Sequence, residues 1–434
     1  MPQRGITTCV KSRLNLSSVL AVPAGALIGS SRARGGAVRT TSSHLGSVFI
    51  LAAVIGVGPL SIDMYLPGLP ALAAAFHAEA GSVQLTLASF FVGLALGQIA
   101  YGPASDRFGR KRPLYAGLAL YTLASLGCAL APSIGSLIAW RFLQALGGCA
   151  GMVISRAVVR DLFDQRDAAR VFSLLMAVMG VAPILAPAAG SALLGLLGWR
   201  AVFVTLAAFG LVTLLAVAFA LPETREPGEV MPGAPWDDYL HLLTDARFVG
   251  YALSGGVALG GMFAYIAGSP FVFIELYGVS PTTYGWLFGL NALGLIGAAQ
   301  LNRRLLDSWS TDQILSAANV ATAVTGLALA CAAAVPGAPL VVLSLPLFAF
   351  MAGLGFTQPN ALAGAMGRHA RRAGSAAALY GTVQFGTATL AASLVGVLHD
   401  RTARSMAGVM ASCSLIALLA QRVLVQRRAR RPSA

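Results

Sequence analysis

Long uninterrupted runs of apolar residues alternate with short polar segments along most of this chain. A bilayer core of about 30 Å needs about 20 apolar residues per helix, so each long charge-free run is a candidate membrane span. The runs are continuous rather than alternating, which favours helices over the strands of a barrel. Twelve helical spans are predicted, at Val48–Leu69, Leu85–Gly102, Leu114–Ala131, Leu137–Ser155, Phe172–Leu194, Trp199–Leu221, Val249–Ile274, Tyr284–Leu301, Ile314–Ala334, Pro339–Met366, Gly374–Val397 and Ser405–Ala420.

The composition of the 434 residues agrees with this pattern, because 57% are apolar, only 11% are charged, and the mean hydropathy is +0.75. A disordered or nucleic-acid-binding basic protein would be poor in apolar residues and rich in lysine. Here Lys11 and Lys111 are the only lysines. The five cysteines show no CxxC spacing, which argues against a disulfide framework. The predicted class is an all-α integral membrane protein, with two bundles of six helices.

Most of the positive charge falls on one predicted side of the membrane. If the N-terminus is placed inside, 26 of the 30 Lys and Arg residues lie in tails and loops on that side. The exceptions are Arg200, Arg401 and Arg404, with Arg141 inside the fourth span. Since Lys and Arg are concentrated in cytoplasmic loops, both termini are expected to be cytoplasmic in a multi-pass protein of the inner membrane.

Polar breaks divide the chain into five predicted regions. They are a basic, disordered cytoplasmic tail (1–43), a first six-helix bundle (44–221), a cytoplasmic linker (222–247), a second six-helix bundle (248–421) and a basic cytoplasmic tail (422–434). A signal peptide is the alternative for the first region, but Pro23 interrupts its apolar run and no clean cleavage site follows.

The predicted linker contains apolar residues at helical spacing. They are Trp236, Tyr239, Leu240, Leu243 and Phe248. This pattern predicts a short amphipathic helix along the membrane surface. A surface connector between the two bundles is the favoured interpretation, and a docking site for a partner is the alternative.

Two acidic residues lie within or at the end of predicted spans, where a charge costs about 2.5–3.5 kcal/mol on insertion scales and usually marks a pathway. Asp63, well inside the first span, is predicted to bind a proton and the substrate alternately. The structural alternative is a carboxylate that caps a backbone break near Pro59 and Pro67. Glu275 closes the seventh span and is interpreted as a residue of the lipid–water boundary.

The most specific motif is the run from Gly102 to Pro113, GPASDRFGRKRP, in the predicted tight loop between the second and third spans. Gly102 and Gly109 offer backbone freedom for a sharp reversal. Asp106 can pair with a neighbouring guanidinium or cap the N-terminus of a helix. The Arg/Lys cluster suits the anionic inner leaflet. This run resembles the signature loop of the major facilitator superfamily, with Ala104 in place of the usual Leu.

Further motifs follow in the order that such a transporter would have. The run Arg141–Gly148 resembles the superfamily's Arg-x-x-Gln-Gly motif, with Gly one place late, and Gly180–Gly190 resembles the Gly/Pro motif of drug:proton antiporters. Together with Asp63–Pro70 and Ser269–Val272, they are similar to the Bcr/CflA group of multidrug exporters. The resemblance covers about Val48 to Arg422.

The resemblance implies roles for several residues. Arg141 would tune the proton-coupling site formed with Asp63, whereas its structural alternative is an arginine that reaches the interface. Pro183 and Pro187 lie on one face of the fifth span and would bend it, and Gly180 and Gly190 would allow close packing. The bend would seal the cavity against proton leak, and ordinary packing in a Gly-rich bundle is the alternative. The implied gating residues of the signature loop are Gly102, Asp106, Arg107, Gly109, Arg110 and Lys111.

Aromatic, methionine and amide side chains within spans suit adaptable binding of apolar, weakly polar compounds. The substrate-binding candidates are Tyr65, Met152, Phe263, Phe271, Asn291, Gln358, Tyr380 and Gln384. Met262, Tyr265, Gln300 and Asn360 are further candidates for the lining of a pocket.

The resulting prediction is a proton-driven exporter of drugs or other small amphiphilic compounds, which acts as a monomer and binds no nucleic acid, metal or cofactor. A transporter of a specific metabolite, such as a sugar, amino acid or nucleoside, is the alternative, because a fold alone does not fix a function. A membrane enzyme is disfavoured because all five histidines lie in predicted tails or loops. No Walker A motif supports ATP hydrolysis.

Overall fold

The computed structural model describes residues 42–163, 165–224, 235–367, 369 and 373–426. The chain divides into two units, Met1–Ser43 and His44–Ala434, and the bundle of helices lies in the second. The predicted N-terminal tail lies almost wholly outside the described residues. Residues 225–234 of the predicted linker and 427–434 of the predicted C-terminal tail also lie outside them.

Helices make up all the regular structure of the described residues. The first half contains α1 (Ser42–Asp63), a 3₁₀ turn (Leu66–Gly68), α2 (Leu69–Phe76), α3 (Ala80–Phe108), α4 (Lys111–Ala129), α5 (Ile134–Leu162), α6 (Gln165–Leu197) and α7 (Trp199–Ala220). The second contains α8 (Pro235–Thr244), α9 (Ala246–Pro270), a π-helical turn (Phe271–Leu276), α10 (Pro281–Leu305), α11 (Thr311–Ala334), α12 (Leu340–Met366), α13 (Ala373–Val397), α14 (Arg404–Ala420) and a second π-helical turn (Gln421–Gln426).

Twelve helices of the described residues have 17 residues or more, six in each half. In the described chain, nine helical segments are long and apolar enough to cross a membrane, while α4, α10 and α13 fall outside these limits. Helix α4 begins with Lys111 and Arg112, and helix α10 has Arg303 and Arg304 in its last turn. The predicted all-α membrane class is confirmed.

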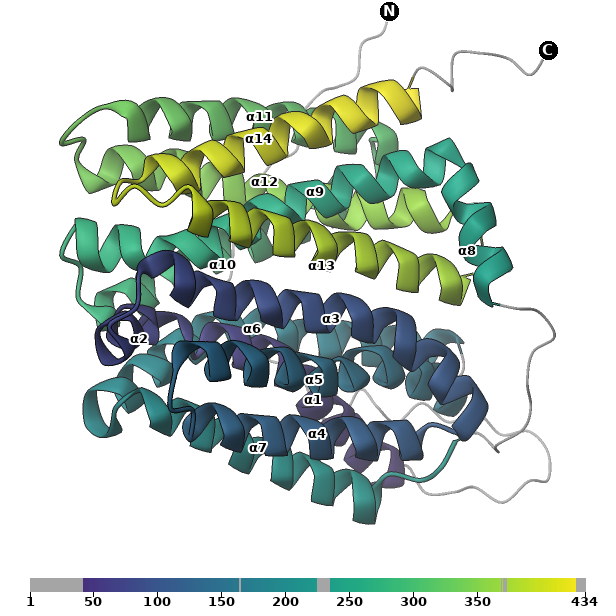
Figure 1. The fold of residues 1–434 in the computed structure, drawn as a ribbon. Coiled ribbons are helices and arrows are strands. Elements are labelled where there is room, and N and C mark those ends of the chain that lie inside the picture. The colour runs from purple at the N-terminus through teal and green to yellow at the C-terminus, as the bar shows by residue number, and fades with distance from the viewer. Residues whose placement is uncertain (1–41, 164, 225–234, 368, 370–372, 427–434) are drawn as a thin grey trace, which may run out of the picture. The chain divides into compact units, whose positions relative to one another are not determined.

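The two halves pack as two groups of helices, α1–α7 and α8–α14, which lie one above the other in Figure 1. Within the first group, α5 contacts α3 and α4, and α4 also contacts α7. Within the second group, α9 contacts α12, α13 and α14. Two helix pairs make most of the contact between the halves, α3 with α13 and α6 with α10. We call the two ends of the bundle the α2 end and the α8 end, after the short helices labelled there (Figure 1).

Small residues allow the helices to approach closely. A Cβ atom built on Gly93 of α3 would lie 2.5 Å from the Phe142 carbonyl oxygen of α5, and one built on Gly97 would lie 2.5 Å from Cys149 Cβ. Because lipid tails are as apolar as leucine, helices in a membrane associate through such close packing rather than through the hydrophobic effect. Many large apolar side chains accordingly remain on the surface, such as Phe49 (70% exposed), Leu196 (81%) and Phe219 (87%).

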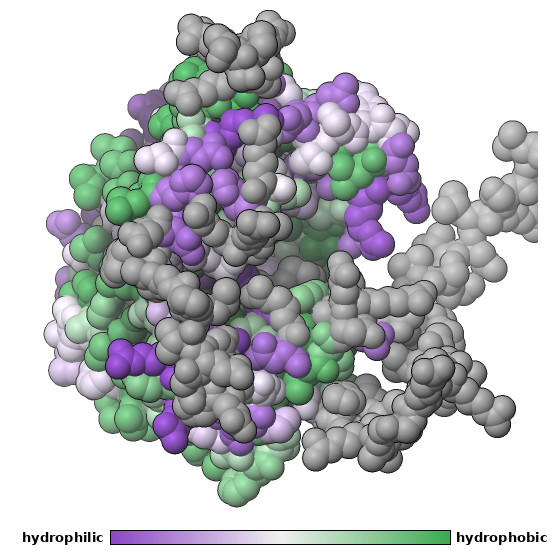
Figure 2. Space-filling model, turned by 90° about the vertical axis from the view of Figure 1, so that its right-hand side faces the viewer, coloured by the Kyte–Doolittle hydropathy of each residue, from purple (hydrophilic) through white to green (hydrophobic). Residues whose placement is uncertain are grey.

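The α8 end has a different surface. Figure 2 looks at this end, where hydrophilic residues gather on the face and hydrophobic residues lie around its rim. In α8, Leu242 is fully buried, while Leu240 and Leu243 of the predicted apolar face are 63% and 54% exposed. Helix α8 packs on α9 and α13, and it therefore belongs to the second half.

Two expected boundaries differ from the structure. The predicted loop Gly102–Pro113 is mostly helical, because α3 continues through Pro103 to Phe108 and only Gly109 and Arg110 separate it from α4. Gly109 has φ of 82°, which suits glycine, whereas Gly102 is helical. The first predicted span is broken after Asp63, where the chain passes through the Leu66–Gly68 turn into α2.

Candidate functional site

Asp63 is the last residue of α1 and is only 4% exposed. Pro59 lies in the preceding turn of this helix, and the turn Leu66–Gly68 follows it. Within the described residues, the Asp63 carboxyl forms no ion pair or hydrogen bond with another side chain. A buried carboxyl without a cationic partner is costly when it is ionised, which makes Asp63 a candidate for a proton-binding group.

Arg141 of α5 is fully buried, and aromatic rings surround its guanidinium. Its Cζ atom lies 4.5 Å from the ring centre of Tyr65, 4.2 Å from that of Phe90 and 5.8 Å from that of Phe203. The faces of aromatic rings attract a cation, and this attraction is strongest where water is excluded. Arg141 therefore lies in an aromatic cage within the first half.

Hydrogen bonds connect this cage to α1 and α4. The Nη1 atom of Arg141 donates to the Ser61 carbonyl oxygen at 3.0 Å and to Gln144 Oε1 at 2.6 Å. The amide of Gln144 in turn donates to Ser125 Oγ at 2.8 Å. Asp63 and Arg141, expected to form one coupling site, make no direct ion pair in the described structure; Arg141 instead binds the α1 backbone two residues before Asp63.

Tyr65 has a structural position in this arrangement. Its hydroxyl is hydrogen-bonded to Thr86 Oγ1 at 2.6 Å, and its ring packs on Phe203 at 5.4 Å between centroids. Only 2% of Tyr65 is exposed. The structure thus places this substrate-binding candidate against Arg141 in the core of the first half.

A second polar cluster lies in the other half, on α9 and α10. Asn291 Nδ2 donates to the Tyr265 hydroxyl at 3.1 Å, and the Ser269 and Tyr284 hydroxyls lie 3.0 Å apart. The Tyr265 ring stacks on Phe288 with 5.5 Å between centroids. Tyr265, Ser269 and Tyr284 are completely buried. Tyr284 was not among the residues selected from the sequence, since a single tyrosine near a helix start carries no distinctive pattern.

An aromatic contact joins the two halves midway along α3 and α9. The rings of Phe91 and Phe263 lie 4.3 Å apart between centroids, and Phe385 of α13 lies 6.1 Å from Phe263. Of the substrate-binding candidates, Phe263 is therefore the one that the structure places directly between the halves. Phe271 is buried beside His399 at 5.7 Å, close to the end of α13.

The remaining candidates lie on several helices. Met152 of α5 packs near Gly58 of α1, where a Cβ atom would lie 3.2 Å from its sulfur. Gln384 Nε2 donates to Gln358 Oε1 at 2.9 Å, and Gln358 Nε2 donates to the Gly255 carbonyl at 2.8 Å. The Tyr380 hydroxyl is buried without a hydrogen-bond partner among the described residues. These amides form a polar strip on α12 and α13 that faces α9.

The antiporter-like segment of α6 contacts the second half. Ser191 Oγ donates to the Pro281 carbonyl oxygen at 2.9 Å, and a Cβ atom on Gly285 would lie 3.4 Å from Ala188 N and Pro187 C. Nearer the α8 end, a Cβ atom on Gly180 would lie 3.3 Å from Ile296. Gly190 meets the first half instead, because its Cβ would overlap the Met64 carbonyl oxygen. Residues of the motif thus contact both α10 and the segment between α1 and the Leu66–Gly68 turn, which we call the α1 break.

The signature-loop residues form a charge cluster at the α8 end. Arg110 is 5% exposed, and its guanidinium donates at 2.8 Å to both Asp106 and Asp161. Glu223 accepts from the backbone N–H groups of Arg110 and Lys111 at 2.9 and 3.0 Å. Burial alone would lower the pKa of Arg110, but the hydrogen bonds to Asp161 and Asp106 raise it above its ordinary value.

This cluster confirms that Asp106 pairs with a neighbouring guanidinium. Asp161 and Glu223 were not selected from the sequence, because they come from α5 and from the segment after α7. The side chains of Arg107 and Lys111 lie near aromatic rings, 5.4 Å from Phe108 and 5.5 Å from Tyr115. The cluster ties together the ends of α3, α4, α5 and α7.

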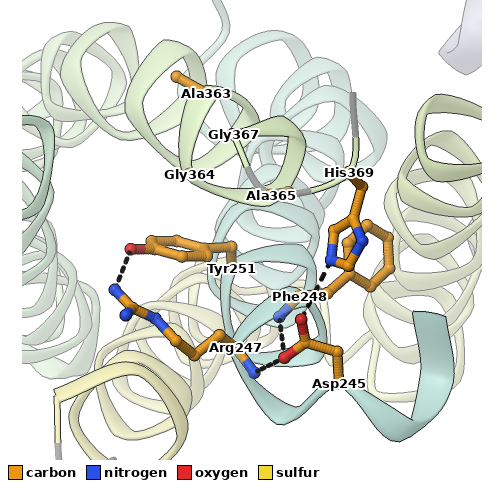
Figure 3. Close-up of a pocket in the computed structure, with 9 residues that line it drawn as sticks. All are labelled: Asp245, Arg247, Phe248, Tyr251, Ala363, Gly364, Ala365, Gly367 and His369. Carbon is orange, nitrogen blue, oxygen red and sulfur yellow. Dashed lines mark hydrogen bonds and ion pairs between the residues drawn. The ribbon is translucent and has the colours of Figure 1, made fainter. Parts of the chain in front are cut away.

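A pocket of about 140 Å³ lies at the start of α9, and Figure 3 shows its lining. Asp245 caps α9 by accepting from the Arg247 N–H at 2.8 Å, and it pairs with His369 Nε2 at 3.1 Å. Partial burial alone would raise the pKa of Asp245, but the hydrogen bonds from Arg247, Phe248 and His369 lower it below its usual value. Ligand pockets usually measure about 300–1,000 Å³, so we interpret this one as a packing gap.

No group of three or more His, Cys, Asp or Glu side chains in the described part of the chain is arranged to hold a metal ion. The chemistry that this geometry offers is therefore that of a buried carboxyl, a caged guanidinium and neutral hydroxyls and amides between two helical halves. These are features of a multi-pass membrane transporter.

Comparison with known proteins identifies the family. A family model described as Major Facilitator Superfamily matches residues 48–392. This chain belongs to the Major Facilitator Superfamily. The chain is 38% identical over 386 residues to the uncharacterized MFS-type transporter YdgK of Bacillus subtilis (strain 168). This match covers 88% of this chain and 96% of that protein.

Drug-resistance proteins are also among its relatives. The bicyclomycin resistance protein homolog of Haemophilus influenzae is 30% identical over 395 residues, covering 88% of this chain and 97% of that protein. A chloramphenicol resistance protein of Pseudomonas aeruginosa is 31% identical over 275 residues, or 63% of this chain and 65% of that protein. The resemblance to Bcr/CflA-type drug-efflux transporters is confirmed by these relatives.

Solved structures show the same fold. A D-xylose–proton symporter matches with a TM-score of 0.70 over 87% of this chain and 97% of that chain, at 15% identity. A bacterial homolog of the human lysosomal transporter Spinster, in an inward-facing and unoccupied conformation, matches with a TM-score of 0.69 over 89% of this chain and 98% of that chain, at 14% identity.

Proposed function

We propose that this chain is a proton-driven secondary transporter that exports drugs or other small amphiphilic compounds across the inner membrane. The observation that carries the proposal is Asp63, a buried carboxyl at the end of α1 without a cationic partner among the described residues. A carboxyl in this position is neutral when protonated and costly when ionised, so proton binding can be exchanged for substrate binding. The names of the drug-resistance relatives support the class of substrate.

The proposed mechanism is alternating access by rocking of the two halves. The contacts of α3 with α13 and of α6 with α10 are the surfaces that would separate and reform. The bend residues Gly180, Pro183, Pro187 and Gly190 would keep α6 against α10 and the α1 break, as the packing of Pro187 and Gly190 supports.

The signature-loop residues are proposed to gate the α8 end. Arg110 holds two carboxylates from α3 and α5, and Glu223 holds the backbone at the start of α4. A cluster that joins four helix ends can break as a unit when the halves rock. Gly109 provides the tight turn, with Gly102, Asp106, Arg107, Arg110 and Lys111 as the other proposed gating residues.

The proposed topology places the α8 end in the cytoplasm. Arg107, Arg110, Lys111 and Arg112 lie at this end, and the positive-inside rule puts such clusters on the cytoplasmic side. Both termini would then be cytoplasmic. We propose that a monomer is sufficient for transport, because both halves that line the path belong to one chain.

Purified protein in proteoliposomes tests the proton coupling. With an imposed proton gradient, the wild-type chain should accumulate a fluorescent cationic dye, and Asp63→Asn should abolish gradient-driven accumulation. Elution as a single species in detergent would show that the variant remains folded. Unaltered pH-dependent transport by Asp63→Asn would refute the coupling role.

The substrate class requires a separate measurement. In a bacterial host that lacks its own efflux systems, the wild-type gene should raise resistance to several unrelated compounds, and Asp63→Asn should not. Uptake or export of a single sugar, amino acid or nucleoside without any resistance would favour the alternative of a transporter for a specific metabolite.

A further inference from the structure

The hydroxyl cluster on α9 and α10 lies beside the chain segment that follows α1. Met64, which follows Asp63, packs against Gly190 of α6. The neighbouring Ser191 of α6 donates to the Pro281 carbonyl oxygen, three residues before Tyr284 on α10. The turn Leu66–Gly68, which directly follows Asp63, contacts both α9 and α10. The only carboxyl in the α1 span of the described chain therefore lies near the part of α9 and α10 that carries these neutral hydroxyls.

Other groups around Asp63 do not offer it a charge. Arg141 of α5 binds the Ser61 carbonyl and lies in its aromatic cage, and Tyr121 of α4 is hydrogen-bonded to Ser61 Oγ at 2.7 Å. From α6, Gly190 and Ser191 approach the α1 break or α10, and neither side chain titrates. On α9 and α10, which the turn after Asp63 contacts, Tyr265 and Tyr284 are the buried titratable side chains at the α2 end.

The tyrosine hydroxyls are held in place within their own half. Asn291 Nδ2 donates to Tyr265 and also to the Leu287 carbonyl at 3.0 Å. Ser269 Oγ lies 3.0 Å from the Tyr284 hydroxyl. Because a hydroxyl both donates and accepts, such a cluster can accept the O–H of a protonated carboxyl and donate to its other oxygen.

We propose that Tyr265 and Tyr284 receive the protonated carboxyl of Asp63 across the interface between the halves and so hold the α2 end closed. This inference rests on the proposed proton coupling at Asp63 and names its partner in the second half. The proton stays on Asp63, and the tyrosines act as positioning residues that remain neutral. When Asp63 loses its proton, a buried carboxylate must leave the apolar contact or find a cation, and the α2 end opens.

The closed fraction of the α2 end can be measured by electron–electron distance spectroscopy. Spin labels at His77 and Leu398, both exposed at this end, would report its opening in a background with the native cysteines replaced. The closed fraction should fall as the pH rises. In Tyr265→Phe and in Tyr284→Phe, the midpoint should move to lower pH by about one half to one unit, as expected for one lost hydrogen bond.

Tyr277→Phe is the matched control. The Tyr277 hydroxyl donates to the Ala338 carbonyl at 2.9 Å, so this change also removes a hydrogen bond near the α2 end, but one made within the second half. The midpoint should remain that of the wild type. A shift equal to that of Tyr265→Phe would contradict the inference.

A double-mutant cycle separates an action through Asp63 from a general loosening of the fold. In an Asp63→Leu background, Tyr265→Phe should no longer change the closed fraction. If Tyr265→Phe changed the closed fraction equally in the wild-type and Asp63→Leu backgrounds, the inference would be overturned. It would also be overturned if Tyr265→Phe had no effect in either background.

An Asp63→Asn background serves if the leucine variant fails to insert. There the pH dependence should vanish, while Tyr265→Phe should still lower the closed fraction at every pH, because the amide retains an acceptor and a donor. Persistent pH dependence in Asp63→Asn would mean that the proposed coupling residue is wrong. Lost pH dependence with no effect of Tyr265→Phe would leave the coupling intact and refute only the tyrosine partnership.

Discussion

A buried carboxyl at the end of α1 and a guanidinium enclosed by aromatic rings are the two ionisable groups on which the proposed mechanism depends. Asp63 and Arg141 stand out in the sequence because charges in apolar spans are rare and costly. Both are indeed buried. The partners of Arg141 come from residues such as Phe90 and Phe203, whose side chains are ordinary members of apolar spans. No sequence spacing indicates that an arginine will be caged by rings from three segments.

Replacing Arg141 by lysine should test the aromatic cage. Lysine keeps the charge but loses the flat guanidinium and its two hydrogen bonds, to the Ser61 carbonyl and to Gln144. We expect a loss of about 1–3 kcal/mol of stability, measured by thermal unfolding of the purified protein in detergent.

Arg200→Lys provides the matched control for that measurement. Arg200 also lies over an aromatic ring, 4.3 Å from the centre of Trp199, but it is exposed. Exposed substitutions usually change stability by less than about 0.5 kcal/mol. Similar losses in the two variants would show that burial in the cage has no special importance.

At the scale of helices, hydropathy located the spans but misplaced several ends. Apolar length marks where the chain leaves the membrane, whereas a helix ends where its backbone hydrogen bonds stop. The polar residues Ser105, Asp106 and Arg107 can continue α3 beyond the apolar run, and they do so up to Phe108. The first predicted span fails in the opposite way, because its apolar run continues while the helix breaks after Asp63.

The break after Asp63 predicts a sharp difference between two glycines of α6. A Cβ atom on Gly190 would overlap the Met64 carbonyl, whereas one on Gly195 would meet nothing within 4 Å. Gly190→Ala should therefore lower the yield of folded protein and the transport rate. Gly195→Ala should be neutral or stabilise the helix by up to about 1 kcal/mol, since alanine is the better helix former.

Detergent-solubilised yield, thermal unfolding and dye transport would measure both glycine variants side by side. Equal behaviour of the two would show that the close packing of α6 on the α1 break is unimportant. A folded Gly190→Ala variant with impaired transport would indicate that the backbone near Asp63 has shifted.

At the scale of the whole molecule, the contacts between the halves at the α2 end are close. A Cβ atom on Gly81 of α3 would lie 2.8 Å from the Gly396 carbonyl of α13. Gln84, one turn further along α3, is fully buried at this contact, and neither of its amide atoms has a hydrogen-bond partner among the described residues. A buried polar group without a partner costs about 1–3 kcal/mol, so this contact holds a built-in penalty.

Gln84→Leu should remove this penalty and favour closure of the α2 end. We expect a larger closed fraction in the spin-label measurement and slower transport, because reopening becomes harder. Gln84→Asn retains an amide, so its closed fraction should stay closer to that of the wild type. A closed fraction that is unchanged by Gln84→Leu would show that the amide is satisfied when the halves meet.

The sequence by itself determined that this protein is a helical membrane transporter, because span length, Lys and Arg placement and the motifs are written in consecutive residues. It also selected Asp63, Arg141 and the signature-loop residues, because a charged residue within or beside an apolar run can be recognised from the sequence alone. Only the tertiary structure decided what these residues face. Arg141 lies in an aromatic cage and forms no ion pair with Asp63 in the described structure, and the turn that follows Asp63 contacts α9 and α10. Such contacts join segments that are far apart in the chain, and close packing of helices fixes them.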